Sequence, residues 1–282
     1  MIFRFVSHDL NEGIIRYRKR YLLIILVAII SCFMLDRSTE YITTTYGGYW
    51  TPLEYGINLF LGRYPFVYRP DSMDTFTVPF VWILTYILLA FVIGDYVQKD
   101  MQGYGMYMML KSKKRSYWWI SKCVWCVIVN LVYFGLIWLT YISYAWMKNG
   151  DIAIYKNLFI RSNYFGWRFE DKSVGFLIMM VVVMPILVGV VQSIIQIFLS
   201  VVFDATVTMV FVAGGLVLSC YYGNPLIPHG YGMLLRYYKD ESNPDFVPND
   251  IQSGIVILLT MIVIATVVGY VFFRRKNILS RR

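Results

Sequence analysis

The feature of this sequence that most constrains its fold is the recurrence of long apolar runs along the whole chain. A helix needs about 20 apolar residues to cross the hydrocarbon core of a membrane, and fewer where flanking side chains reach back to the surface. Six stretches meet this requirement: residues 21–35, 78–97, 123–146, 174–203, 207–222 and 254–273. The sequence therefore predicts an all-α integral membrane protein, with six transmembrane helices in a single domain over residues 1–282.

The composition fits a membrane protein better than a soluble one. Charged residues make up 15% of the chain, against about a quarter in a typical soluble domain. The formal net charge of +9 could suggest a nucleic-acid partner, but the Lys and Arg residues lie beside the apolar stretches and form no separate basic stripe. We therefore expect these Lys and Arg residues to contact membrane lipid and not nucleic acid.

Two of the six stretches have unusual lengths. Residues 21–35 are a short span, and with the preceding RYRKR they could be a lipoprotein signal that ends at Cys32. We favour the span, because the chain returns to the membrane five more times. Residues 174–203 exceed the hydrocarbon thickness, so we expect a tilt or a bend at Pro185.

The distribution of basic residues predicts the orientation, because Lys and Arg are retained on the cytoplasmic side. With six spans, 16 of the 26 Lys and Arg residues fall on the side that holds both chain ends. We therefore expect cytoplasmic N and C termini.

Two segments outside the spans have mixed character. Residues 1–20 combine apolar and basic residues, which is typical of an amphipathic helix at the membrane interface, although a solvated tail is the alternative. Residues 223–253 begin with a proline-rich aromatic stretch that could dip back towards the membrane or pack on neighbouring helix ends.

The sequence lacks the groupings that catalysis would require. His8 and His229 are the two histidines, so no HExxH site can form, and no Gly precedes a Lys, so the phosphate-binding P-loop is missing. Cys123 and Cys126 form a lone CxxC, which we interpret as a buried helix turn and not as a zinc site. We expect no enzymatic activity, metal site or cofactor in this chain.

Polar residues inside the spans are candidates for function, because they are costly in lipid. Gln192 and Gln196 are four residues apart and share one helix face, and Asn130 lies within residues 123–146. These three residues could line a pathway or form hydrogen bonds between helices, and we favour helix packing.

The most specific segment reads KDMQGYGMYMMLKSKKRSYWWISK and covers residues 99–122. Its apolar cluster at 106–110 and its paired Trp118 and Trp119 are more than a hydrophilic connection needs. We expect a short helix at the cytoplasmic membrane surface, with basic residues that meet lipid phosphates or a partner protein. A plain interfacial anchor is the alternative.

The series Gly103, Leu110, Arg115, Trp119 and Lys122 is similar to the segment after the second helix in the ABC-2 family of transporter permeases. This resemblance implies a cytoplasmic coupling helix between helices 2 and 3, in a bacterial plasma-membrane exporter of peptides, antimicrobials or other amphipathic molecules. It also implies a dimer with a second or related permease, and two separate ATPase subunits that bind ATP and Mg. The coupling residues would be Gly103, Tyr104, Met106, Met109, Leu110 and Arg115.

A non-transporting membrane protein is the competing hypothesis. Such a sensor or scaffold would recruit a cytoplasmic partner through the same segment and would move no cargo.

Overall fold

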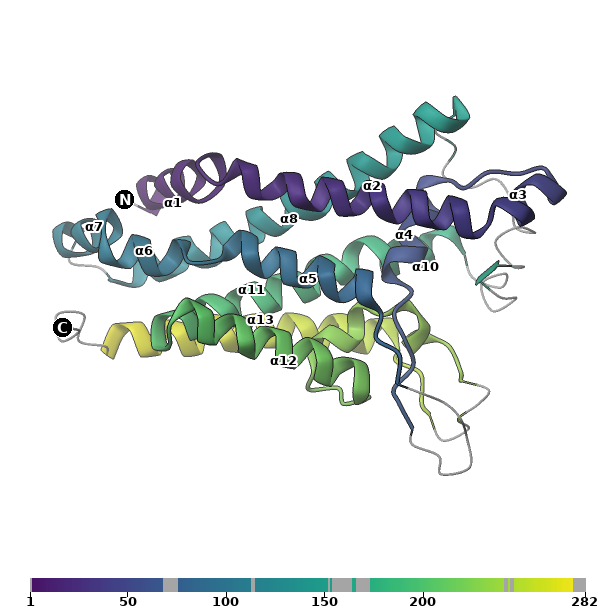
Figure 1. Ribbon diagram of the computed structural model, residues 1–282. Helices are drawn as coiled ribbons and strands as arrows, with labels where there is room; N and C mark the ends of the chain where they lie inside the picture. The colour runs from purple at the N-terminus through teal and green to yellow at the C-terminus, as the bar shows by residue number, and fades with distance from the viewer. Residues whose placement is uncertain are drawn as a thin grey trace.

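The computed structural model describes residues 2–67, 76–112, 115–151, 153, 164–165, 173–240, 243 and 246–275. Within these residues every regular element is helical. The long helices run side by side, and α1, α7 and the last turn of α13 lie at one end of the bundle (Figure 1). We call this the terminal end, and we call the opposite end, which holds α3 and α4, the loop end.

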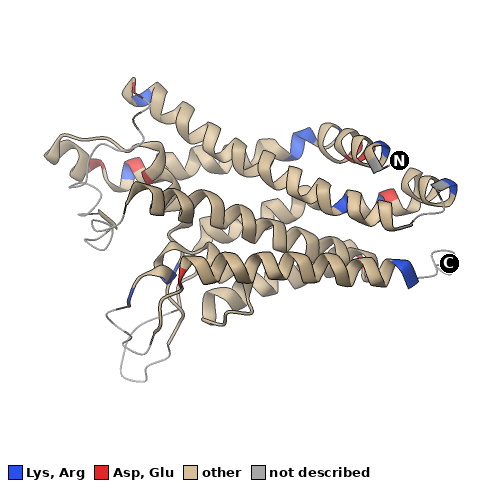
Figure 2. Cartoon of the chain, turned by 180° about the vertical axis from the view of Figure 1, so that it is seen from behind, with Lys and Arg blue, Asp and Glu red and all other residues tan. Residues whose placement is uncertain are grey.

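Five helices are long and apolar enough to cross a membrane, which makes the chain a helical membrane protein. They coincide with five of the six predicted stretches. The fifth stretch, 207–222, contains the shorter apolar helix Ala205–Tyr221. Figure 2 shows the charged residues mainly near the helix ends. The helices that occupy the six stretches are α2 (Tyr21–Ser38), α5 (Phe80–Ile93), α8 (Arg115–Asn149), α11 (Met184–Val202), α12 (Ala205–Tyr221) and α13 (Ile251–Arg275).

The N-terminal segment is a helix and not an irregular tail. Helix α1 (Ile2–Leu10) continues through a π-helical turn and a short 3-10 turn into α2. Phe5 and Asp9 are four residues apart and buried, whereas Phe3 and Arg4 on the other face are exposed. One face of α1 therefore packs on the protein and the other remains open.

The fourth predicted stretch is interrupted where the sequence places Pro185. Helix α10 (Val174–Ile178) passes into a π-helical turn, Met179–Val183, before α11 begins. Proline has no N–H to donate to the preceding turn, and π-helical turns absorb such local mismatches. The irregularity expected at Pro185 is therefore present as a π-helical turn directly before it.

The segment 99–122 differs from the prediction of one surface helix. It divides into the end of α6 (Tyr96–Gln102), then α7 (Tyr104–Ser112), and then the start of α8. Trp118 and Trp119 are fully buried in α8, and Trp119 stacks on Phe273 of α13. The expectation of one short helix was therefore wrong, because the segment is divided over three helices and α8 turns both tryptophan rings into the bundle.

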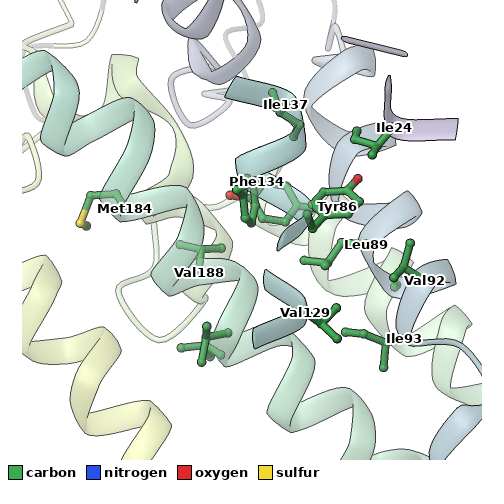
Figure 3. Close-up of a cluster of buried hydrophobic side chains, with 14 of the residues drawn as sticks. Ile24, Tyr86, Leu89, Val92, Ile93, Val129, Phe134, Ile137, Met184 and Val188 are labelled. Carbon is green, nitrogen blue, oxygen red and sulfur yellow. The ribbon is translucent and has the colours of Figure 1, made fainter. Parts of the chain in front are cut away.

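The centre of the bundle is formed by α5, α8 and α11 (Figure 3). Leu89, Val129 and Val188 come from these three helices and are fully buried. In lipid such contacts stabilise helix pairs through close packing and not through exclusion of water. Helix α13, by contrast, leaves most of its apolar surface outward.

At the loop end, two segments fold back against the bundle. Helix α4 (Pro52–Phe60) is almost entirely buried against α2 and α8. The segment after α12 forms two 3-10 turns, Pro228–Gly232 and Leu234–Tyr237, and packs against α11 and α12. The indole N–H of Trp82 donates to the carbonyl of Gly232 over 3.0 Å. Of the two alternatives for this stretch, the structure shows packing, against α11 and α12.

Candidate functional site

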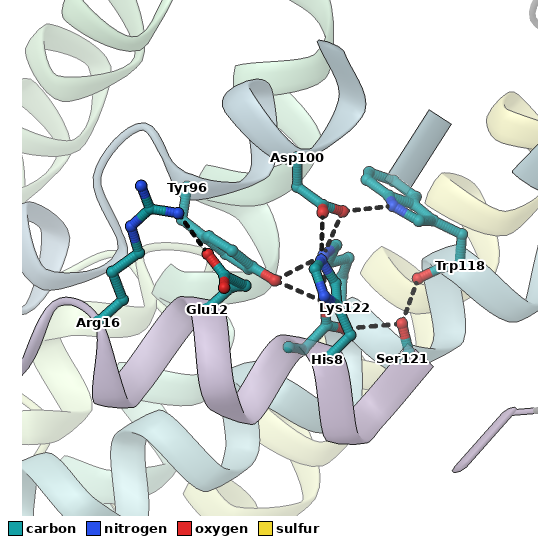
Figure 4. A network of polar contacts seen from close by, with 9 residues as sticks. His8, Glu12, Arg16, Tyr96, Asp100, Trp118, Ser121 and Lys122 are labelled. Carbon is teal, nitrogen blue, oxygen red and sulfur yellow. Dashed lines mark hydrogen bonds and ion pairs between the residues drawn. The ribbon is translucent and has the colours of Figure 1, made fainter. Parts of the chain in front are cut away.

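A buried ionic cluster joins three elements at the terminal end (Figure 4). The side chain of Lys122, on α8, is 0% exposed, and its ammonium contacts Asp9 of α1 and lies 2.7 Å from Asp100 of α6. Asp9 also accepts hydrogen bonds from the hydroxyls of Tyr96 (2.7 Å) and Ser121 (2.8 Å). Because α1 and α8 are far apart in the sequence, this ammonium fixes a long-range contact.

The cluster has metal-ligand chemistry but already contains its own cation. Donor atoms of His8, Asp9 and Asp100 lie within 4.8 Å of one another, as a metal site would require. Lys122 contacts both carboxylates, so its ammonium occupies the place that a cation would take. The one ammonium is shared by the two carboxylates, and its removal would be costly because both would stay buried without a cation.

Asp100 is the point at which α7 reaches the cluster. Its carboxylate accepts from the indole N–H of Trp118 (2.8 Å) and bonds the imidazole of His8 (2.9 Å). A Cβ at Gly105 of α7 would lie 2.1 Å from Asp100 Oδ2, so only glycine allows this approach. Of the GYG fragment, Gly105 therefore serves the packing of α7 on α6.

A second ion pair lies where α5 passes into α6. Arg20, at the start of α2, donates to the carbonyl of Phe91 (3.0 Å) and to the carboxylate of Asp95 (3.1 Å). Gly94 separates the two helices. The guanidinium therefore satisfies carbonyls at the end of α5 and ties α2 to α6.

Beside the cluster, α1, α6 and α7 enclose an open cleft of about 1220 Å³. His8 and Asp100 belong both to the cleft and to the cluster. The His8 ring also lies 4.6 Å from the ring of Tyr104. A ligand or partner in the cleft would therefore contact the cluster directly.

The structure distributes the predicted coupling residues over two environments. Gly103 and Tyr104 line the cleft, and Leu110 is 56% exposed on α7. Met106 is partly buried against the core, and Met109 is buried. The side chain of Arg115, at the start of α8, lies outside the described residues.

The predicted intramembrane residues meet in a seam between α5, α8 and α11. Gln192 and Gln196 donate to the carbonyls of Tyr86 (3.0 Å) and Ala90 (2.8 Å), four residues apart on α5. The amide of Asn130 on α8 donates to Ser193 of α11 over 2.8 Å. All of these groups are buried and bonded between helices.

Two further contacts tighten this seam. A Cβ at Gly189 would lie 2.3 Å from Asn130 Oδ1, so α8 and α11 approach closely at that position. The imidazole of His229 donates from Nε2 to the amide oxygen of Gln192 over 2.9 Å, since that oxygen can only accept. Burial lowers the pKa of His229 to about 4, so this ring is neutral at physiological pH.

Sequence reasoning missed His8, Asp9, Asp100 and His229 as members of these two clusters. Asp9 does carry a local signal, because it lies four residues after Phe5 on the apolar face of the N-terminal helix. His229 carries none, since a single histidine in a proline-rich segment has no periodicity to place it.

A family model described as "Protein of unknown function (DUF2705)" matches residues 24–279. No curated protein and no solved structure matches the chain. The geometry at the terminal end therefore carries the functional argument.

Proposed function

We propose that this chain, which belongs to the DUF2705 family of proteins of unknown function, is the permease subunit of an ATP-binding cassette exporter. Two copies of a separate ATPase subunit would bind ATP and Mg, and this chain would provide the membrane pathway with a second or related permease. The cargo would be a peptide, an antimicrobial or another amphipathic molecule, exported across a bacterial plasma membrane.

In this proposal the chain crosses the membrane six times, with α12 as the fifth span, and the terminal end faces the cytoplasm. The excess of Lys and Arg on that side supports the orientation. A reporter fused after Thr45, at the loop end, should then be detected outside the cell. A cytoplasmic signal would contradict the orientation and the coupling role of α7.

The observation that carries the proposal is the exposed apolar surface of α7 on a rigid support. Tyr104, Tyr107 and Leu110 are all more than half exposed, and Tyr104 and Tyr107 also line the cleft beside the cluster. Exposed aromatic and aliphatic side chains on one short helix are typical of a protein-binding site. The support is provided by Asp100 of α6, against which α7 packs at Gly105.

Contacts from α7 lead directly into the membrane helices. Asp100 bonds Lys122 of α8, and Lys122 bonds Asp9 of α1, which leads into α2. Because packed interiors are not easily compressed, a displacement of α7 would move these elements together. The chain would thus convert a push from an ATPase into a rearrangement of its spans.

Co-purification tests the proposal. The chain is expressed with the ATP-binding protein encoded beside it, extracted in detergent and isolated by a tag on the permease. We expect a stable complex whose ATPase rate depends on the permease. Failure to recover any ATPase would contradict the proposal and favour the sensor or scaffold hypothesis.

A matched pair of substitutions then tests the surface of α7. Tyr107→Ser with Leu110→Ser should weaken ATPase binding by about tenfold or more, because each removes an exposed apolar anchor worth about 1 kcal/mol. Leu226→Ser, which alters an even more exposed apolar residue at the loop end, should leave binding unchanged. Equal effects of the two changes would remove α7 as the docking element.

A further inference from the structure

The cleft at the terminal end has a basic wall contributed by three helical segments. Arg4 comes from α1, Arg16 follows the π-helical turn after it, Lys99 comes from α6 and Lys111 from α7. Residues so far apart in the sequence converge here because the Asp9–Lys122–Asp100 cluster holds α1 against α6 and α8.

Two of these four charges are available to a ligand. Arg16 pairs with Glu12 at 2.6 Å, and Lys99 pairs with Asp95 at 2.5 Å. Within the described residues no carboxylate lies at ion-pair distance from Arg4 or Lys111, and both side chains are exposed. Asp100 also borders the cleft and shares the Lys122 ammonium with Asp9, so the cleft lining has four Lys and Arg residues against the two carboxylates of Glu12 and Asp100. The cleft therefore has an excess of positive charge.

The same walls are rich in aromatic side chains. Phe3 is 83% exposed, and Tyr104 and Tyr107 are more than half exposed. Ser7 and Asn11 add polar groups on the α1 side. Aromatic rings beside basic groups suit the headgroup layer of a membrane, where one part of a ligand is apolar and the other charged.

We infer that this cleft binds an anionic phospholipid, with its phosphate between Arg4 and Lys111 and its glycerol region against the aromatic wall. Arginine forms strong charge-assisted hydrogen bonds to phosphate oxygens, and the cleft volume of about 1220 Å³ can hold a headgroup. The cleft lies where α1 joins α2, a helix apolar enough to cross the membrane. A lipid can therefore reach it from the bilayer. The site shares Tyr104 and Tyr107 with the proposed docking surface of α7, but lipid retention is measured without an ATPase, so the two proposals can fail separately.

Native mass spectrometry of the purified chain tests this site. The protein is extracted without a partner, washed in detergent and exposed to phosphatidylglycerol or phosphatidylcholine. We expect one retained phosphatidylglycerol per chain and weaker retention of phosphatidylcholine. Arg4→Gln with Lys111→Gln should reduce phosphatidylglycerol retention by about tenfold, because it removes both of the direct charge-assisted contacts to the lipid phosphate.

Arg18→Gln with Lys19→Gln is the matched control, because it removes the same charge from exposed residues next to the cleft that do not line it. This control should change retention by less than about threefold. Equal losses in the two double variants would assign the lipid to diffuse surface attraction and overturn the site. Thermal unfolding of both variants is measured alongside, and their exposed side chains should leave it unchanged.

Two more outcomes would also overturn the lipid assignment. Displacement of phosphatidylglycerol by millimolar inorganic phosphate would identify a free phosphate as the ligand. Retention of no lipid, together with protection of a cysteine at Arg4 only when an ATPase is bound, would assign the cleft to the partner protein.

Discussion

The buried cluster at the terminal end carries full charges, whereas the seam inside the bundle carries neutral polar groups. Around Lys122, charged side chains bond one another across α1, α6 and α8. Around Gln192 and Gln196, side-chain amides donate to backbone carbonyls of α5. Both clusters join helices, but they differ in what remains when one partner is removed.

Loss of the Lys122 ammonium at the terminal end leaves two buried carboxylates without compensation, which is a very expensive defect for a buried site. Loss of a partner in the seam leaves a neutral group, and some of these groups retain another bond. The carbonyl of Ala90, for example, also accepts the N–H of Gly94 over 2.8 Å. We therefore expect the terminal-end cluster to behave as a fixed joint and the seam as a contact that can open at lower cost.

The largest effect should come from Lys122→Met. This change leaves Asp9 and Asp100 buried with no ammonium between them, which should cost about 3–5 kcal/mol. Thermal unfolding in detergent should shift down by about 10 °C, and trypsin should cut at Arg16 and Arg18 once α1 is released.

The control for this prediction neutralises the whole cluster. The triple variant Asp9→Asn, Asp100→Asn, Lys122→Met has no buried charge, so it should recover most of the lost stability. If Lys122→Met unfolds at the wild-type temperature, the cluster is not the joint that we describe.

The pH dependence of stability should be the next largest effect, and it belongs to the seam. Unfolded His229 has its ordinary pKa of about 6.5, whereas burial lowers it to about 4 in the fold. Between these values the unfolded state binds more protons, so stability is complete above about pH 6.5 and falls as the pH drops towards 4. The full loss amounts to about 3 kcal/mol.

His229→Gln isolates this contribution, because its amide can still donate to Gln192 but does not titrate. The difference in unfolding midpoint between wild type and His229→Gln is measured from pH 7 to pH 4. A difference that stays constant with pH would show that folding does not lower the pKa of His229, and it would contradict this prediction.

The smallest effects should separate the two glutamines. Gln192→Leu leaves the His229 N–H without its acceptor and should cost about 2 kcal/mol. Gln196→Leu should cost about 1 kcal/mol or less, because Ala90 keeps its bond from Gly94. Chemical unfolding measures the free energy of unfolding of both variants. Equal losses would show that the two glutamines stabilise the seam to the same extent.

The sequence predicted the five long apolar helices, because apolar length is a local property. It placed Gln192 and Gln196 on one face, and both donate to α5. It placed the start of the third span after Lys122, because a lysine normally marks the membrane boundary. Lys122 is buried instead, since Asp9 and Asp100 compensate its charge, and no local pattern could show a contact with a residue 113 positions away.

The short helix α12 has a consequence for the bilayer itself. Its 17 residues extend about 26 Å, less than the hydrocarbon thickness of about 30 Å. The buried guanidinium of Arg236 donates to the carbonyls of Ser219 and Tyr222 (2.9 Å), so the helix end is satisfied by protein and needs no water. In the proposed six-span arrangement, the lipid beside α12 would therefore match a thinner wall than the lipid beside α13, and the leaflet at the loop end would be drawn inward on that side alone. Such an asymmetric collar of thinned lipid would orient neighbouring proteins around the bundle and favour residence in thinner membranes.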